Sequence, residues 1–376
     1  MIMQSKKNID IVIPSYRLEE KYIIPLIDLP KPEGWSFNYF IVVDNPAVKI
    51  SPQIESYAAT GLVTLLINPY NLGASFSRNR GMEAGTGQWV LFLDDDIRAK
   101  NELLFHYVNA IDRYPEEIGF IGLVKLPPPP TAFAKALLMN GSMMIFGIAE
   151  KTPSFSWGAT ANMMVKRSAV GDIRFSEKYP KFGGGEDVDF FLSVRDKNQC
   201  GDYRTLKEAV VCHPWWKEGK PDFVRHFRYG EGNSYLAAFN PQYAYYDFPN
   251  TPETLFLMVV VLPVAAIASS SGLVVWITVF GWVVVAEAIA TWIQLAKRHA
   301  SVTVPILYYV LRLKFAYSTG MLMANLRRGR LKGIGERFEF KGQHHRNGFF
   351  QFNTYKIVKW VLYIFVLLLL GYLCLR

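Results

Sequence analysis

Three consecutive aspartates, Asp94, Asp95 and Asp96, directly follow an apolar run in the sequence. Carboxylates at hydrogen-bonding distance repel each other and raise each other's pKa, so this run needs a neutralising partner. A divalent cation is a common partner, and oxygen ligands from one or two side chains, completed by phosphate, suit Mg²⁺ or Mn²⁺. The alternative is a solvated turn or an N-cap for a helix that starts near Asn101.

A second acidic group, Glu186, Asp187 and Asp189, follows the glycine run 183–185 and precedes an apolar helical segment. At a helix N-terminus the macrodipole favours carboxylates, which is the structural interpretation. The chemical interpretation makes one of them a general base. Farther along, His213 follows the apolar run 209–212 and precedes Pro214-Trp215-Trp216. It is either a structural histidine or a ligand of a metal or diphosphate.

The segment Asn71-Leu72-Gly73, followed by Arg78, opens a predicted helix over residues 73–85. Free N–H groups at a helix N-terminus bind phosphate, and a glycine lets a ligand come close. Arg78 can add a charge-assisted hydrogen bond. The pattern therefore predicts a phosphate-binding loop, although such a loop is common at helix starts.

These groups need a scaffold, and the apolar runs predict one. Residues 9–13, 39–43, 62–67, 88–93 and 118–124 read as strands, and residues 73–85 and 101–113 read as helices. Strands alternating with helices indicate an α/β fold with a largely parallel sheet. Ligands of such sheets bind at the carboxyl ends of the strands, where Asp44 and the aspartate run both fall. The prolines 127–130 interrupt this pattern, and the apolar segment 131–148 is expected to rest on a membrane.

The C-terminal part of the chain is strongly apolar. Residues 255–295 contain one charge, Glu287, and are about twice as long as a membrane span requires. The break at Ser269-Ser270-Ser271-Gly272 predicts a hairpin of two helices, and the basic residues 297–298 return the chain to the cytoplasm. Residues 302–326 hold Arg312 and Lys314, which favours an interfacial helix. Residues 357–375 are expected to span the membrane or to re-enter it.

Charge and cysteine content narrow the function classes. Of the 41 Lys and Arg residues, thirteen lie between Lys297 and Lys359, against the two acids Glu336 and Glu339. Basic residues placed between apolar segments indicate attraction to anionic membrane lipids rather than nucleic-acid binding. Three cysteines without a CxxC pattern exclude a disulfide scaffold and a zinc ribbon, and fit a reduced, cytoplasm-facing compartment.

The predicted organisation has two parts. Residues 1–250 form a cytoplasmic catalytic domain, because no apolar leader precedes the first strand. Residues 251–376 form a membrane region with a hairpin at about 254–296, an interfacial helix at about 302–326, a basic segment at 327–359 and a last helix at about 357–375. The chain is therefore expected to be an integral membrane protein, of the cell membrane if it is prokaryotic.

The ordered set of motifs resembles the family 2 glycosyltransferases with the GT-A fold. The matching pieces are Ile-Pro-Ser-Tyr (13–16), Val-Val-Asp-Asn (42–45), Asn-Leu-Gly…Arg-Asn-x-Gly (71–81), Phe-Leu-Asp-Asp-Asp (92–96), Trp-Gly-Ala (157–159), Gly-Gly-Glu-Asp-Val-Asp (184–189) and His213. They cover about residues 8–235. Each piece is modest alone, but their order is specific to the family. The resemblance implies a GT-A-like, Rossmann-type mixed sheet, largely parallel, with flanking helices and a helical membrane region behind it.

The resemblance also implies roles for the matched positions. Asp44 would contact the base of a nucleotide-sugar, with UDP favoured, and Arg78 its ribose or diphosphate. Pro14, Tyr16, Asn71, Gly73 and Asp95 would complete the donor site. Asp94 and Asp96 would hold Mn²⁺ or Mg²⁺ with His213, and Asp187 would deprotonate the acceptor hydroxyl with support from Glu186. Acceptor binding would fall to Trp157, Trp215, Trp216, Arg225 and Arg228.

Two departures and several alternatives remain open at this point. Three aspartates instead of two leave the register of the metal pair ambiguous, and the Gln-x-x-Arg-Trp motif of processive synthases is absent. The sequence favours inverting transfer of a sugar to a hydroxyl of a lipid or lipid-linked acceptor. A polyprenyl-phosphate glycosyltransferase, whose phosphate acceptor needs no base, is the main alternative. A nucleotidyltransferase and an inactive membrane scaffold are more remote.

Overall fold

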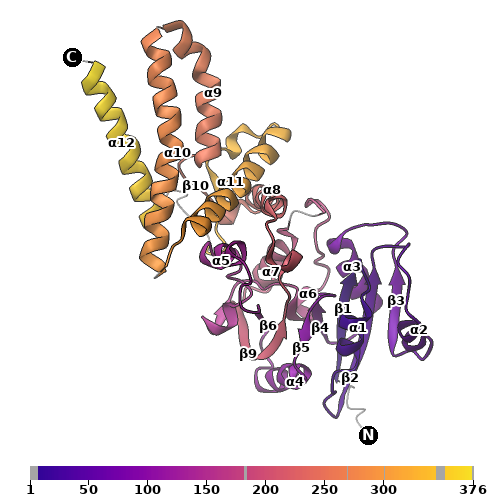
Figure 1. The fold of residues 1–376 in the computed structure, drawn as a ribbon. Helices are drawn as coiled ribbons and strands as arrows, with labels where there is room; N and C mark the ends of the chain where they lie inside the picture. The colour runs from indigo at the N-terminus through magenta and orange to yellow at the C-terminus, as the bar shows by residue number, and fades with distance from the viewer. Residues whose placement is uncertain (1–6, 182–183, 269, 300, 344–351, 375–376) are drawn as a thin grey trace. The chain divides into compact units, whose positions relative to one another are not determined.

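The computed structural model of the chain describes residues 7–181, 184–268, 270–299, 301–343 and 352–374. They form two compact units, and Figure 1 labels most of their helices and strands. Unit 1 comprises Met1–Pro128, Met143–Glu218 and Phe340–Gly342, and unit 2 comprises Pro129–Ser142, Gly219–Glu339 and Gln343–Arg376. The division therefore differs from the predicted boundary at residue 250.

Aromatic packing explains why the boundary differs. Helices α5 (Ala132–Met139) and α8 (Phe223–Phe239) both pack against α11 (Val304–Arg327). The rings of Phe133 and Phe223 contact Tyr309, with centroids 5.5 and 6.4 Å away. Apolar faces on α5 and α8 are thus buried against α11, so both helices belong to unit 2.

Unit 1 is built on one mixed sheet. The strands, in sheet order, are β3 (Val63–Ile67), β2 (Trp35–Val43), β1 (Lys7–Ser15), β4 (Trp89–Leu93), β8 (Asn162–Lys166), β6 (Gly119–Lys125), β9 (Tyr203–Cys212) and β5 (Arg98–Ala99), with β7 (Ser154–Phe155) paired to β9. The pairs among β1, β2, β3 and β4 are parallel, as is β6 with β9. Strand β8 runs antiparallel between β4 and β6. The predicted largely parallel α/β sheet is confirmed.

The parallel half of the sheet brings three chain segments to one edge. Ser15 at the end of β1 lies beside Val43 at the end of β2, and Val12 of β1 lies beside Phe92 of β4. The carboxyl ends of parallel strands meet at the same edge of a sheet. Asp44 and the aspartate run therefore emerge together there, as the strand pattern predicts.

Helices flank the sheet of unit 1. They are α1 (Glu20–Ile27), α2 (Pro52–Ala59), α3 (Ala74–Ala84), α4 (Leu103–Arg113), α6 (Arg167–Val170) and α7 (Glu186–Lys197). Helix α7 is fixed by an aromatic core. Phe190 stacks on Phe175 with centroids 3.9 Å apart, and Phe190 and Phe191 meet Phe92 of β4 edge-on. This packing fixes the first turn of α7 relative to the end of β4.

Unit 2 contains the apolar C-terminal helices α9 (Thr251–Ala268), α10 (Ser270–Arg298) and α12 (Thr354–Cys374), and the short pair β10 (Ala244–Tyr246) and β11 (Glu336–Phe338). Gly272–Arg298 and Thr354–Tyr372 are long and apolar enough to cross a membrane, by length and composition only. Only 17% of each apolar window is buried, whereas a soluble core helix is mostly buried. Ser269 of the predicted turn and residues 344–351 of the basic segment lie outside the described residues.

Glu287 of α10 joins four helices of unit 2. Its carboxylate pairs with Lys314 of α11 at 2.9 Å and with Lys359 of α12 at 3.1 Å. It also accepts hydrogen bonds from the hydroxyls of Thr251, Thr291 and Tyr355. A charge among apolar helices is costly unless it is paired. The network therefore explains both Glu287 and Lys314, the charges that stood out in the apolar sequence.

Helices α8 and α11 approach at two glycines. A β-carbon added to Gly230 would lie 1.9 Å from the carbonyl oxygen of Tyr317, and one added to Gly320 would lie 1.9 Å from that of Phe227. Only glycine allows backbones to come this close. Gly230, two residues after Arg228, thus has a packing role in unit 2.

We predict that Gly320→Ala lowers the stability of the protein by about 1–3 kcal/mol, because the added methyl group forces the two helices apart. Thermal unfolding of the detergent-extracted chain measures this. Gly281→Ala in α10 is the matched control, because a β-carbon there has nothing within 4 Å. It should be neutral or stabilising by up to about 1 kcal/mol. Equal midpoints for the two variants would contradict the close crossing.

Candidate active site

The three aspartates after β4 point to different partners. Asp95 accepts a hydrogen bond from the Ser15 hydroxyl at 2.6 Å, which ties it to the end of β1. Arg17 donates to Asp96 at 2.9 Å and lies 3.6 Å from Asp95. Sequence reasoning missed Ser15 and Arg17. Ser15 belongs to the Ile-Pro-Ser-Tyr motif and Arg17 follows it. This motif does not predict contacts with residues about 80 positions farther along the chain.

Asp94, Asp96 and His213 form a group that could hold a metal ion. One potential ligand atom from each residue lies within 4.8 Å of the other two. The Nε2 atom of His213 is 3.3 Å from Asp96, and its Nδ1 lies 2.6 Å from the carbonyl oxygen of Pro214. A carbonyl only accepts, so Nδ1 carries a proton and donates it there. Nε2 is therefore the ring nitrogen that could bind a metal, and a ligand histidine that donates its other N–H to a carbonyl is usual in metal sites.

His213 is rigidly held. It is 2% exposed, and the rings of Phe146 and Trp216 lie on it with centroids 5.2 Å away. The residues present therefore fit a divalent ion of the Mg²⁺ or Mn²⁺ type, with two carboxylates and one imidazole. The aspartates of this group are Asp94 and Asp96, whereas Asp95 accepts a hydrogen bond from Ser15.

Arg78 of α3 connects the two acidic groups. Its guanidinium lies 3.1 Å from Glu186 at the start of α7 and 3.9 Å from Asp94 at the end of β4. The side chain is 8% exposed, and its Nε has no hydrogen-bond partner among the described residues. A buried donor without a partner is costly. Arg78 thus offers a free donor at the point where the acidic groups meet.

Glycines place Glu186 and Asp187 in the first turn of α7. Gly184 and Gly185 have φ values of +73° and +103°, a region that favours glycine, and Gly185 is the N-cap. Gly183 of the predicted glycine run lies outside the described residues. The chain can therefore turn sharply into the helix and present both carboxylates at its N-terminus.

Two carboxyl groups of the site have pKa values far above normal. Burial, opposed by Arg78, raises the pKa of Asp94 to about 6. Burial and then the neighbouring Glu186 charge raise the pKa of Asp187 to about 7, again opposed by Arg78. A carboxylate with a pKa near 7 is suited to take up a proton at neutral pH. Titratable groups with strongly shifted pKa values are typical of functional sites.

Asp44 organises the predicted phosphate loop. Its carboxylate accepts hydrogen bonds from the backbone N–H groups of Leu72 and Gly73, at 2.7 and 2.8 Å, and from the Asn68 side chain at 2.9 Å. Lys181, another residue that sequence reasoning missed, donates to the carbonyl of Asn71 at 2.8 Å. The buried Oδ1 of Asn71 has no partner among the described residues. The loop therefore has a polar atom left for a ligand.

The remaining predicted site residues have mixed surroundings. In unit 1 the indole N–H of Trp157 donates to Phe340 and that of Trp215 to Pro127, and both side chains are buried. Pro14 is the second-last residue of β1, and Tyr16, the first residue after this strand, is 53% exposed. Arg225 and Arg228 lie on α8 of unit 2. The roles of these residues in binding donor or acceptor stay predictions.

Residues 10–174 match the family model described as glycosyl transferase family 2. The amylovoran biosynthesis glycosyltransferase AmsB of Erwinia amylovora is 27% identical over 177 residues, which cover 45% of this chain and 58% of that protein. The glucosyl-dolichyl phosphate glucuronosyltransferase of Haloferax volcanii is 31% identical over 84 residues, 22% of this chain and 27% of that one. The chain thus spans less than two thirds of the length of these relatives.

Among solved structures, the chain resembles Staphylococcus aureus TarS 1–349 in complex with UDP. The TM-score is 0.41 and the identity 16%, over 91% of this chain and 100% of that one.

We predict that Asp96→Asn and His213→Ala each weaken Mn²⁺ binding at least tenfold, because each removes one of three ligands. Mn²⁺ affinity of the wild type should also fall as the pH drops through about 6, since a proton on Asp94 competes with the metal. Calorimetric titration at several pH values measures both effects. Asp95→Asn is the control and should bind Mn²⁺ as the wild type does. Loss of Mn²⁺ binding in Asp95→Asn would contradict Asp94 and Asp96 as the two aspartate ligands.

Proposed function

We propose that the chain is an inverting, metal-dependent glycosyltransferase, on the basis that residues 10–174 match the model of glycosyl transferase family 2. It moves a sugar from a nucleotide-sugar, with a UDP-sugar favoured, to a hydroxyl group of a lipid or lipid-linked acceptor. The reaction takes place at the cytoplasmic face of a membrane. The observation that carries this proposal is the position of Arg78 between Asp94 and Glu186. It joins the candidate metal ligands to the start of α7, where Asp187, the candidate base, follows Glu186.

The donor side is supported by charges of opposite sign at the end of the sheet. A nucleoside diphosphate would meet Arg78, Arg17 and the N–H groups at the start of α3. Helix N-termini and arginine forks are the usual partners of phosphate oxygens. Asp94, Asp96 and His213 would hold Mn²⁺ or Mg²⁺, which as a Lewis acid neutralises the negative charge that grows on the leaving diphosphate.

The base would be Asp187. With a pKa of about 7 it is partly ionised at neutral pH and gains basicity compared with an ordinary aspartate. In this mechanism Asp187 takes the proton of the acceptor hydroxyl as its oxygen attacks the anomeric carbon, and the bond to the diphosphate breaks in the same step. Arg78 stabilises the departing negative charge with a fixed guanidinium, which needs no reorganisation during the reaction.

The acceptor class is supported by unit 2 and by one relative. Two helices of the chain are long and apolar enough to cross a membrane, and the basic residues 297–298 end the first of them. Basic residues flanking a span favour the cytoplasmic side. The Haloferax relative is named for transfer to glucosyl-dolichyl phosphate, a lipid-linked sugar. A sugar hydroxyl on a lipid carrier is the acceptor that suits a general base best.

We predict that Asp187→Asn lowers kcat by about 10²–10⁴-fold with little change in donor affinity, because the variant keeps shape and loses basicity. Single-turnover assays and donor titration measure the two quantities. Asp189→Asn in the same helical turn is the control, since it removes an equivalent interaction with the helix dipole. Near-normal turnover in Asp187→Asn would instead favour a phosphate acceptor, as in polyprenyl-phosphate glycosyltransferases.

We also predict that activity of the wild type rises with pH through about 7, as Asp187 loses its proton. Glu186→Gln removes the negative charge that raises this pKa, so the acidic limb of the pH–rate profile should move to lower pH. Profiles of kcat/KM for both proteins measure this. An acidic limb that stays in place in Glu186→Gln would mean that another group controls it.

A further inference from the structure

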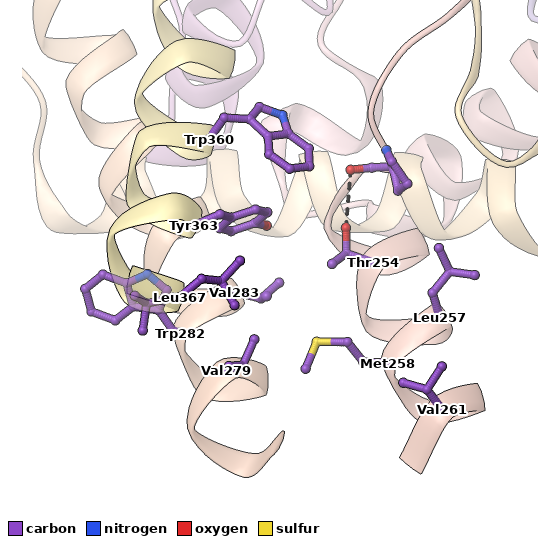
Figure 2. Close-up of a pocket in the computed structure, with 12 residues that line it drawn as sticks. Thr254, Leu257, Met258, Val261, Val279, Trp282, Val283, Trp360, Tyr363 and Leu367 are labelled. Carbon is purple, nitrogen blue, oxygen red and sulfur yellow. Dashed lines mark hydrogen bonds between the residues drawn. The ribbon is translucent and has the colours of Figure 1, made fainter. Parts of the chain in front are cut away.

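Unit 2 contains a groove that the catalytic proposal does not use. It has a volume of about 340 Å³ and is lined by residues of α9, α10 and α12 (Figure 2). Among them are Leu257, Met258, Val261, Val279, Val283 and Leu367. Ligand pockets of proteins range from about 300 to 1,000 Å³. The groove is therefore large enough for part of a small apolar molecule.

The groove is continuous with the exposed apolar surface of its helices. Leu257, Val261 and Leu367 line it and are still 39%, 52% and 58% exposed. In a soluble protein such exposed apolar side chains would be unfavourable. In a membrane they face the hydrocarbon region, so hydrocarbon chains have direct access to the groove.

A polar atom points into the groove. The hydroxyl group of Tyr363 faces the gap toward α9, where Thr254 already donates to the carbonyl of Pro249 at 3.3 Å (Figure 2). Tyr363 is 8% exposed, and its hydroxyl faces the side chains of Thr251 and Thr254 without a hydrogen bond of good geometry among the described residues. A buried hydroxyl without a partner costs free energy. An oxygen of a bound molecule would satisfy it.

The end of the groove near Tyr363 carries an excess of positive charge. Lys359 contacts the Tyr363 ring and shares the carboxylate of Glu287 with Lys314, so two lysines face one acid. Beyond the lining of the groove, Lys297 of α10 donates to Thr354 at the start of α12, nine residues before Tyr363. Trp360 also lines the groove, and tryptophan and tyrosine are typical of membrane interfaces. This end thus suits a negatively charged headgroup.

We propose that the groove binds one acyl chain of an anionic phospholipid. The chain lies between α9 and α12, an ester oxygen accepts a hydrogen bond from Tyr363, and the phosphate lies at the Lys297 end. The inference rests on the membrane location proposed above, but on no step of sugar transfer. The acyl chain fills the gap between the apolar side chains of these helices, and its contacts with them stabilise unit 2.

The test measures lipid binding to the purified full-length chain. Native mass spectrometry and thermal unfolding are carried out with added phosphatidylglycerol, phosphatidylcholine or polyprenyl phosphate, without a sugar donor. We expect retention of phosphatidylglycerol in preference to the other two, and a higher unfolding midpoint with it. Equal effects of phosphatidylcholine, or a preference for polyprenyl phosphate, would overturn the assignment.

Paired variants locate the site. Val261→Trp places an indole in the groove, whereas Val260→Trp adds the same group at a neighbouring position that is 58% exposed and outside the lining. We expect at least tenfold weaker phosphatidylglycerol binding in Val261→Trp and unchanged binding in Val260→Trp. Leu367→Trp and Leu368→Trp repeat the comparison on α12, in case one variant does not fold. Unchanged binding in folded Val261→Trp or Leu367→Trp would refute the proposal.

The polar contacts have their own variants. Tyr363→Phe should weaken phosphatidylglycerol binding several-fold. Lys297→Gln should reduce the preference for phosphatidylglycerol over phosphatidylcholine. Full lipid preference in both variants would overturn the assigned headgroup position. Because none of these measurements uses the transfer reaction, a chain that binds lipid as described but transfers no sugar would refute only the catalytic proposal.

Discussion

The repulsion among carboxylates at the edge of the sheet is the constraint on which unit 1 depends. Ligand oxygens of Asp94 and Asp96 lie within 4.8 Å of each other. At an effective dielectric constant of about 20, two unit charges at that separation repel by roughly 3–4 kcal/mol. Glu186 and Asp187 add further negative charge. Arg78, buried between the two groups, and Arg17 offset part of it. Burial is the main reason that the pKa values of Asp94 and Asp187 are raised, and the neighbouring charges of Asp96 and Glu186 add to it. A bound cation would offset the remaining repulsion among these carboxylates.

The helices of unit 2 recognise each other through close backbone approach and through a few paired polar groups. Close backbone approach at Gly230 and Gly320 replaces hydrophobic selectivity at the α8–α11 crossing. Glu287 then links α9, α10, α11 and α12 through its two lysines and three hydroxyl donors. Breaking a buried pair costs more than the pair contributes, so this network favours one arrangement of the helices within the unit.

The sequence predicted the parts of the site that follow from local order. Strand ends located Asp44 and Asp94–Asp96, and a glycine run before an acidic helix start located Glu186 and Asp187. Pairings between distant segments were not predictable. The contacts of Arg17 with Asp96 and of Lys181 with Asn71 depend on how loops fold back, for which no periodicity exists. The sequence marked a break at prolines 127–130, but it did not predict that α5 and α8 group with α11, since aromatic contacts between these helices decide it.

The two interpretations of Asp187 can be separated by the sign of its pKa shift. A carboxylate that serves only the helix dipole is stabilised in its charged form, so its pKa falls. Asp187 lies in the first turn of α7, yet its pKa is raised because burial and Glu186 outweigh the dipole and Arg78. The fold therefore keeps this group poorly stabilised as an anion. That is unfavourable for a helix cap and favourable for a base, and it supports the proposal that Asp187 takes up the proton.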